Sequence, residues 1–184
     1  MKKILIVLGT VILLVMAALA FFRHNTKSAS PETELNYEAD GLLVQVLYNR
    51  PFKKSRVIFD SVGLVPFGKV WRTGANEATI FETSKDLIIN SKTLKAGKYT
   101  LWVLPNQQNW TVIFNSEYGQ WGIDFNGVAN RDPQNDVLSV DAPVLLQEKV
   151  FEQFTISVEK AGEEHELVFI WDTTLVSVPF TVAP

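Results

Sequence analysis

The sequence predicts an all-β domain, an antiparallel β-sandwich, preceded by one apolar N-terminal helix. Residues 4–22 form an almost uninterrupted apolar stretch. From residue 42 onward, apolar and polar residues alternate with a period of two, and turn-forming residues separate the alternating stretches. After residue 36, no window of helical length shows the period of 3.6 that an amphipathic helix requires. We therefore expect one membrane-type helix and a β domain.

Composition excludes several function classes. The chain has 184 residues, which is enough for one domain and a targeting segment. It has no cysteine, so disulfides, zinc ribbons and thiol catalysis are excluded. Outside the four basic residues in or beside the N-terminal segment, 13 basic residues face 20 acidic ones. Because nucleic acids attract basic domains, an acidic domain of this kind is not expected to bind them.

The N-terminal segment, residues 1–23, predicts a signal anchor or a signal peptide. Its apolar stretch matches the roughly 20 residues that the hydrocarbon core of a bilayer requires. The sequence Ala18-Leu19-Ala20 resembles a cleavage site, but Phe21 and Phe22 continue the apolar run beyond it. Anchor and cleaved signal both remain open. We expect membrane contact through residues 4–22 and an extracytoplasmic domain, periplasmic or at the cell surface, or a secreted domain after cleavage.

Residues 24–36 are mostly polar and predict a short flexible tether. The β domain is then expected to span residues 37–184. The alternating stretches that predict strands are 42–49, 99–104, 110–115, 153–159, 166–171 and 175–182. Alternation does not separate jelly-roll-like from immunoglobulin-like connectivity. Two long segments, 51–76 and 115–136, do not alternate, and long loops in a small domain are often functional.

The long segments contain a distinctive string, Trp71-Arg72-Thr73-Gly74-Ala75-Asn76-Glu77. With residues 50–56, 94–105 and 110–122, it closely resembles the bacterial exported proteins called domain of unknown function 2911. The resemblance covers about residues 41 to 160. It departs at Asn49 and Phe67, where serine and tyrosine are usual, and residues 124–136 form a longer segment than expected. The resemblance implies an exported, β-rich domain and no known activity.

Cationic residues gather in and beside the first long segment, where Asp60 is the single acid among them. They are Arg50, Lys53, Lys54, Arg56, Lys69 and Arg72. Guanidinium groups bind carboxylate or phosphate in a bidentate manner, so Arg72, Asn76 and Glu77 are candidates for a polar pocket floored by Trp71. The alternative is a structural salt bridge between Arg72 and Glu77 that pins the loop to the sheet.

The tryptophans divide into two groups. Trp102 and Trp110 lie in predicted strands and are expected to be buried in the core. Trp71 and Trp121 lie in predicted loops, where an exposed indole can stack on a sugar ring. For these two residues, core packing is the alternative interpretation.

Oxygen-bearing side chains in the second long segment suggest a calcium loop, but their spacing does not match an EF-hand. These residues are Asp124, Asn126, Asn130, Asp132 and Asp136. Turn formation explains them better, and we expect no metal and no cofactor. A hydrolase would use Glu77 as its acid or base, but a glycosidase needs a second carboxylate facing it. We therefore expect a non-enzyme, with catalysis through Glu77 as an alternative.

Together these patterns predict a non-catalytic, extracytoplasmic binding module for a carbohydrate or another polar or anionic ligand. The expected site residues are Trp71, Arg72, Asn76, Glu77, Trp121, Arg56 and Lys69. Two alternatives stay open. One is a structural or assembly protein of the cell envelope that binds another protein, and the other is a hydrolase built around Glu77.

Overall fold

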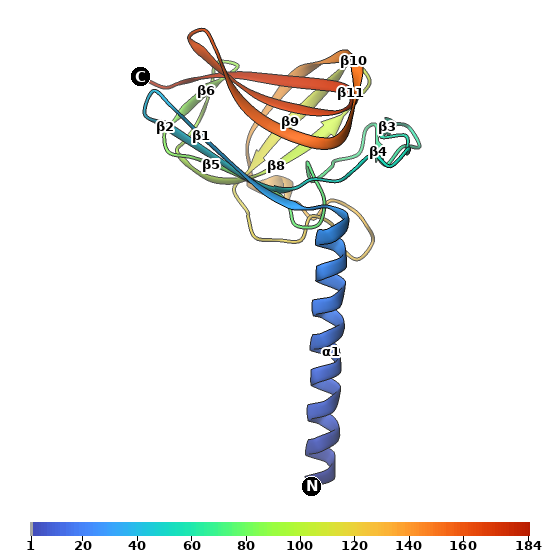
Figure 1. Ribbon diagram of the computed structural model, residues 1–184. Coiled ribbons are helices and arrows are strands. Elements are labelled where there is room, and N and C mark those ends of the chain that lie inside the picture. The colour runs from blue at the N-terminus through green and yellow to red at the C-terminus, as the bar shows by residue number, and fades with distance from the viewer. Residues whose placement is uncertain (1) are drawn as a thin grey trace.

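In the computed structural model, which describes residues 2–184, a long N-terminal helix leads into a two-layered β domain (Figure 1). The helix, α1 (Lys2–Ala29), is long and apolar enough to cross a membrane, and its apolar part lies outside the domain. It ends just before Pro31, because proline disfavours helical backbone in the residue before it. The C-terminal end of α1 is the end that meets the domain (Figure 1).

The first sheet begins with the hairpin of β1 (Glu32–Ala39) and β2 (Leu42–Asn49). Beyond β2 follow β5 (Thr79–Thr83), β8 (Gly97–Pro105) and β9 (Asn109–Asn115), all antiparallel. Asp40 and Gly41 turn the first hairpin with positive φ angles of 55° and 71°, which suits the twist of two adjoining strands.

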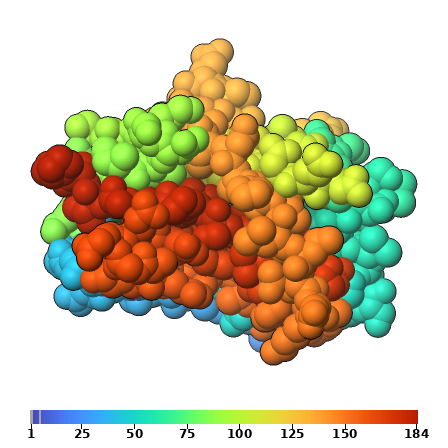
Figure 2. Space-filling model, turned by 90° about the horizontal axis from the view of Figure 1, so that it is seen from above, coloured from blue at the N-terminus to red at the C-terminus, as the bar shows by residue number. Residues whose placement is uncertain are grey.

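The second sheet is continuous with the first through β10 (Asp136–Ala161). The first part of β10 pairs with β9, and the rest pairs with β11 (Glu164–Val182). Next to β11 lie β6 (Leu87–Ile89) and β7 (Lys92–Leu94). Seen from above, β10 and β11, in orange and red, cover most of the face that points away from α1 (Figure 2). The predicted all-β fold after one apolar helix is confirmed, and the two stacked sheets form a sandwich-like domain.

The main core lies between the two sheets, where each strand places alternate residues inward. Its largest fully buried side chains include Trp110, Trp171, Phe114 and Phe154. A smaller cluster covers the outer face of the first sheet, where Trp102 packs with neighbours from the two long segments. The predicted burial of Trp102 and Trp110 is confirmed, with 0% and 1% of their surfaces exposed.

Two elements differ from the expected pattern. The segment predicted as a flexible tether, residues 24–36, contains the last turns of α1 and the first half of β1. Polar residues occupy one face of β1 because it is an edge strand whose outer face meets solvent. The stretches 166–171 and 175–182 belong to the single strand β11, which is irregular at Asp172, where φ is 55°.

The two long segments contain little regular structure. The first holds only the short parallel pair β3 (Phe59–Asp60) and β4 (Val65–Pro66). The second holds one 3₁₀ turn, Pro133–Asn135. Both segments lie against the first sheet, and parts of both are found at the end of the domain where α1 leaves it (Figure 1).

Candidate functional site

The string 71–77 forms a tight loop that is fixed to the sheet at its start. The backbone N–H and C=O of Trp71 pair with those of Val103, and the Trp71 indole N–H donates to the Gly74 carbonyl at 2.9 Å. Thr73 has a φ of 54°, an unfavourable value for a β-branched residue. The Thr79 hydroxyl holds this conformation by donating to the Thr73 carbonyl at 2.6 Å. Strain of this kind often accompanies functional sites.

The Trp71 ring packs among core aromatics. It stacks on Trp171 with a centroid distance of 5.9 Å, and it meets Phe154 edge-on at 4.8 Å. Phe59 and Trp110 lie at 6.1 and 6.3 Å. Because its ring packs against these core aromatics, Trp71 is not an open platform for a sugar ring.

Arg72 is half-buried and lacks a protein partner. Its Nε is buried without a hydrogen bond, and among the described residues no carboxylate oxygen lies within 4.0 Å of its guanidinium group. Burial lowers the pKa of the Arg72 guanidinium group below its ordinary value. The salt bridge between Arg72 and Glu77, the predicted structural alternative, is not formed.

Glu77 instead joins the domain to α1. Its Oε1 accepts a hydrogen bond from Arg23 at 3.3 Å and lies 3.8 Å from the Lys27 ammonium group. Its Oε2 accepts from the Asn49 side chain at 3.2 Å. Beside it, the Asn76 amide donates to Asn49 Oδ1 and to the Thr26 carbonyl of α1, both at 3.3 Å. Glu77 thus sits in a network that docks the helix.

The predicted partner segment around Trp121 does meet the string. Gly122 N–H donates to the Asn76 carbonyl at 2.9 Å, and Trp121 and Glu77 form an isolated β-bridge. Gly122 also lies directly against the aliphatic stem of Arg72. Trp121 itself is half-buried and does not line the pocket described next.

A pocket of about 340 Å³ opens between the end of α1 and the string. Its walls come from the end of α1, the first long segment, the string and β11. Its lining includes three cationic side chains and no acidic one. The lining residues are Thr26, Ala29, Ser30, Pro51, Lys54, Arg56, Leu64, Val65, Trp71, Arg72, Gly74, Ala75, Asn76 and Trp171.

The predicted cationic cluster separates into different roles. Arg50 donates to the Phe154 carbonyl and the Thr155 hydroxyl, and Lys53 pairs with Asp172 at 2.6 Å. These two side chains therefore serve the structure. Lys54, Arg56 and Arg72 line the pocket, and the Arg56 guanidinium also donates to the backbone carbonyls of Phe52 and Lys53. Lys69 lies elsewhere, beside a separate hollow of about 570 Å³ formed with Val70, residues 126–129 and Arg131.

A family model described as "Protein of unknown function (DUF2911)" matches residues 30–180. The chain belongs to this family. The DUF2911 region begins directly after α1, which lies outside it, and includes the string and strands of both sheets. Among curated proteins and among solved structures, no match was found.

In this DUF2911 domain, the acidic residues of the second long segment serve local turns. The Asp124 carboxylate accepts from the backbone N–H of Asn126 and Val128, at 2.8 and 2.9 Å. The hydrogen bond from Val128 is the main cause that lowers the pKa of Asp124. Asp132 caps the 3₁₀ turn, and Asp136 pairs with Arg131. Within residues 2–184, no group of three or more histidine, aspartate or glutamate side chains is placed to hold a metal ion.

Sequence reasoning missed several members of the site. Thr26, Ala29 and Ser30 contribute one wall of the pocket, and Trp171 contributes another from a distant strand. Asn49, which departs from the usual family residue, bridges Asn76 and Glu77. The asparagine at position 49, where serine is usual, was the one sign in the sequence that this residue has a special role. Its amide can donate to a carboxylate and accept from another amide at the same time.

Proposed function

We propose that this protein is a membrane-anchored, non-catalytic binding module whose pocket takes an anionic ligand bearing a phosphate or carboxylate group. The observation that carries the proposal is the half-buried Arg72, whose guanidinium has no carboxylate partner among the described residues. Buried charges are normally paired, because removing an ion from water is costly. An anion in the pocket would supply the missing partner.

The remaining lining supports an anion over a neutral sugar. Lys54 and Arg56 bring two further positive charges, and Asn76 brings a polar amide. Trp71 is packed into the core, so the stacking surface expected for a carbohydrate is largely lost. The pocket volume of about 340 Å³ lies in the range of small-molecule sites.

The anchor is part of the proposal because α1 contributes to the pocket. Thr26, Ala29 and Ser30 form one of its walls, and Arg23 and Lys27 pair with Glu77. These contacts favour an uncleaved helix over a removed signal peptide. An extracytoplasmic location fits an apolar segment near the N-terminus that precedes the domain.

The contacts of Glu77 favour docking over catalysis. Two cations of α1 and the Asn49 amide occupy its oxygens. Its side chain is therefore committed to holding the helix, which leaves the hydrolase alternative without a free acid or base at this position.

Thermal unfolding of the full chain in detergent micelles tests the binding proposal. A ligand that binds only the folded state raises the melting temperature, and the rise grows with the ratio of ligand concentration to dissociation constant. At constant ionic strength, we expect phosphate, sulfate or carboxylate compounds to raise it, while chloride and neutral sugars leave it unchanged. Arg72→Met should abolish the rise, whereas Lys149→Met, which removes an exposed cation of β10 that does not line the pocket, should preserve it. An equal rise in both variants, or no rise with any anion, would rule the proposal out.

A further inference from the structure

A fully exposed aromatic side chain lies at the tip of the loop formed by residues 123–129. Phe125 has a relative exposure of 111%, and Val128 in the same loop is 61% exposed. The loop is closed by the bridge between Ile123 and Ala129, and the Asp124 carboxylate accepts two backbone N–H groups within it. A locally ordered turn therefore holds Phe125 outward while its acidic neighbour is occupied by backbone contacts.

This loop lies at the end of the domain from which α1 leaves. Gly122, just before the loop, donates its N–H to the Asn76 carbonyl, and the Asn76 side chain donates to the Thr26 carbonyl of α1. Two hydrogen bonds thus link the start of the loop to the last turns of the helix. In Figure 1 the segment after β9, in yellow to tan, comes down beside the top of α1.

The position of α1 sets the height of this end above a bilayer. The apolar stretch ends at Phe22, and Thr26 follows about one turn later, roughly 6 Å along the helix axis. The polar layer on each side of the hydrocarbon core is about 5–7 Å thick. With α1 spanning the membrane, Thr26 and the loop near it would lie within that layer. Phe125, which the loop exposes completely, would then be free to contact the bilayer interface.

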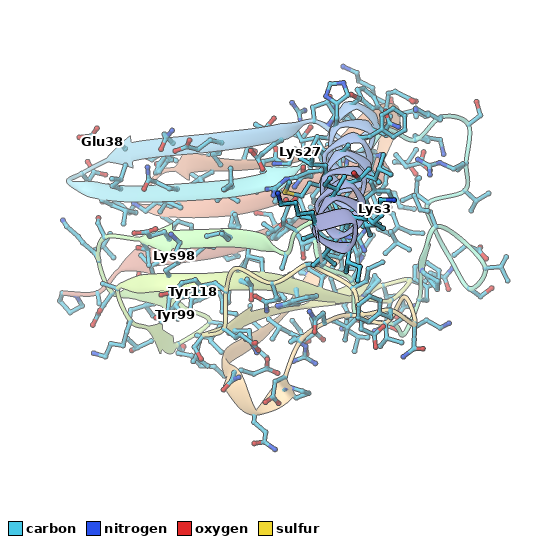
Figure 3. The ribbon with its side chains drawn as sticks, turned by 90° about the horizontal axis from the view of Figure 1, so that it is seen from below. Lys3, Lys27, Glu38, Lys98, Tyr99 and Tyr118 are labelled. Carbon is cyan, nitrogen blue, oxygen red and sulfur yellow. The ribbon has the colours of Figure 1, made fainter. Side chains whose placement is uncertain are left out.

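The charge on this end suits an anionic membrane surface. Arg23, Lys27, Lys54, Arg56 and Lys69 lie on or beside it, and the end of α1 carrying Lys27 is visible from below (Figure 3). Of the acidic residues beside them, Glu32 and Glu77 are paired with α1 cations. Basic residues next to a membrane span are attracted to anionic headgroups.

We propose that loop 123–129 is a second membrane contact, in which Phe125 inserts into the interface of the bilayer that holds α1. This contact would fix the tilt of the domain and bring the mouth of the pocket to the headgroup layer. The inference shares with the proposed function the assumption that α1 remains attached. It does not depend on whether the pocket binds an anion.

The absence of cysteine makes a direct test straightforward. Phe125→Cys carries a fluorophore that responds to polarity, and the full chain is reconstituted into nanodiscs of phosphatidylcholine and phosphatidylglycerol. Leu146→Cys is the matched control, because Leu146 is an apolar residue of β10 that is 78% exposed. In Figure 1, the orange part of β10 lies in the part of the domain farther from α1.

We expect a blue-shifted emission at position 125 and strong quenching by nitroxide-labelled lipid, with neither effect at position 146. A fluorophore at Val128→Cys should show a smaller blue shift and weaker quenching than one at position 125. This second position keeps the test valid if labelling at position 125 disturbs the loop. Water-like emission without quenching at both 125 and 128 would overturn the proposal. Anion-dependent melting of the same protein in micelles would then still support the pocket, so the two failures are distinguishable.

Discussion

Gly122 and Arg72 fit together so closely that residue 122 has no room for a side chain. A Cβ atom at position 122 would lie 2.0 Å from Cδ of Arg72 and 2.8 Å from its Cβ. The second long segment therefore fixes the course of the Arg72 stem, and with it the position of the guanidinium group in the pocket. This contact joins the string 71–77 to residues 110–122, two of the segments that resemble the family.

Replacement of Gly122 by alanine should displace Arg72. Overpacking of this kind costs about 1–3 kcal/mol of folding free energy, and we expect a loss in this range together with weaker anion-dependent stabilisation. Urea unfolding of the full chain in micelles measures the change. The double variant Gly122→Ala with Arg72→Ala should recover much of the stability, because the two residues are in contact and their effects are not additive. Additive losses would show that the displaced group is not Arg72.

Replacement of Arg72 by methionine should leave the unliganded domain as stable as the parent, or more stable by about 1 kcal/mol. The physical reason is that a half-buried cation without a partner is replaced by an apolar side chain of similar length. Thermal unfolding without added anions measures this effect. A loss of several kcal/mol would instead mean that Arg72 is paired in a structural role.

Replacement of Trp71 by alanine should lower the free energy of unfolding by roughly 3–5 kcal/mol, as expected for a large aromatic residue in a packed core. The indole also donates a hydrogen bond to the Gly74 carbonyl, which would be lost. Tyr118→Ala is the control, because Tyr118 is 55% exposed and its removal should change little. If Trp71→Ala proved as mild as the control, Trp71 would be a binding surface and not a core residue.

The two Glu77 variants should differ in a way that reports its partners. Glu77→Gln keeps an oxygen that accepts from Asn49 and loses only the partly exposed ion pairs with Arg23 and Lys27, worth up to about 1 kcal/mol. Glu77→Ala also leaves the buried Asn49 amide without this acceptor, which costs about 1–3 kcal/mol. Unfolding at low and high salt separates the contribution of the ion pairs from that of the Asn49 hydrogen bond, since only the ion pairs weaken as salt rises. If both variants lost the same free energy of unfolding, the hydrogen bond from Asn49 to Glu77 would not contribute to stability.

Acid sensitivity should depend in part on Asp86. Its carboxylate accepts from the Lys95 ammonium group and from the Ala96 N–H, and the Lys95 contact is the main cause that lowers its pKa from the ordinary value of 3.8. A carboxyl whose pKa is lower when folded stabilises the fold above its unfolded pKa and loses this contribution as pH falls through the folded pKa. Asp86→Asn should therefore reduce the decline in stability below about pH 4, as followed by melting temperature against pH. If the melting temperature of Asp86→Asn fell below pH 4 as steeply as that of the parent, other carboxylates would be responsible for the loss of stability.

The sequence by itself determined the class of the fold, because the signals involved are local. Uninterrupted hydrophobicity predicts α1, and a period of two predicts strands such as residues 42–49, since each pattern follows from backbone geometry over a few residues. The string at 71–77, together with residues 50–56, 94–105 and 110–122, indicated the family, and the family match confirms it. The edge strand β1 escaped notice because its exposed face is charged, although Leu35 and Tyr37 alternate correctly.

Only the tertiary structure decided which partner each site residue has. Arg72 and Glu77 are close in sequence and opposite in charge, yet Glu77 pairs with helix residues about fifty positions away and Arg72 packs against Gly122. Periodicity tells which face of a strand a residue occupies, but not which distant segment covers a loop. Lys69 and Trp121 were predicted to join the pocket and do not line it, because the fold directs them to other surroundings. Such long-range packing depends on the whole chain, so no local pattern encodes it.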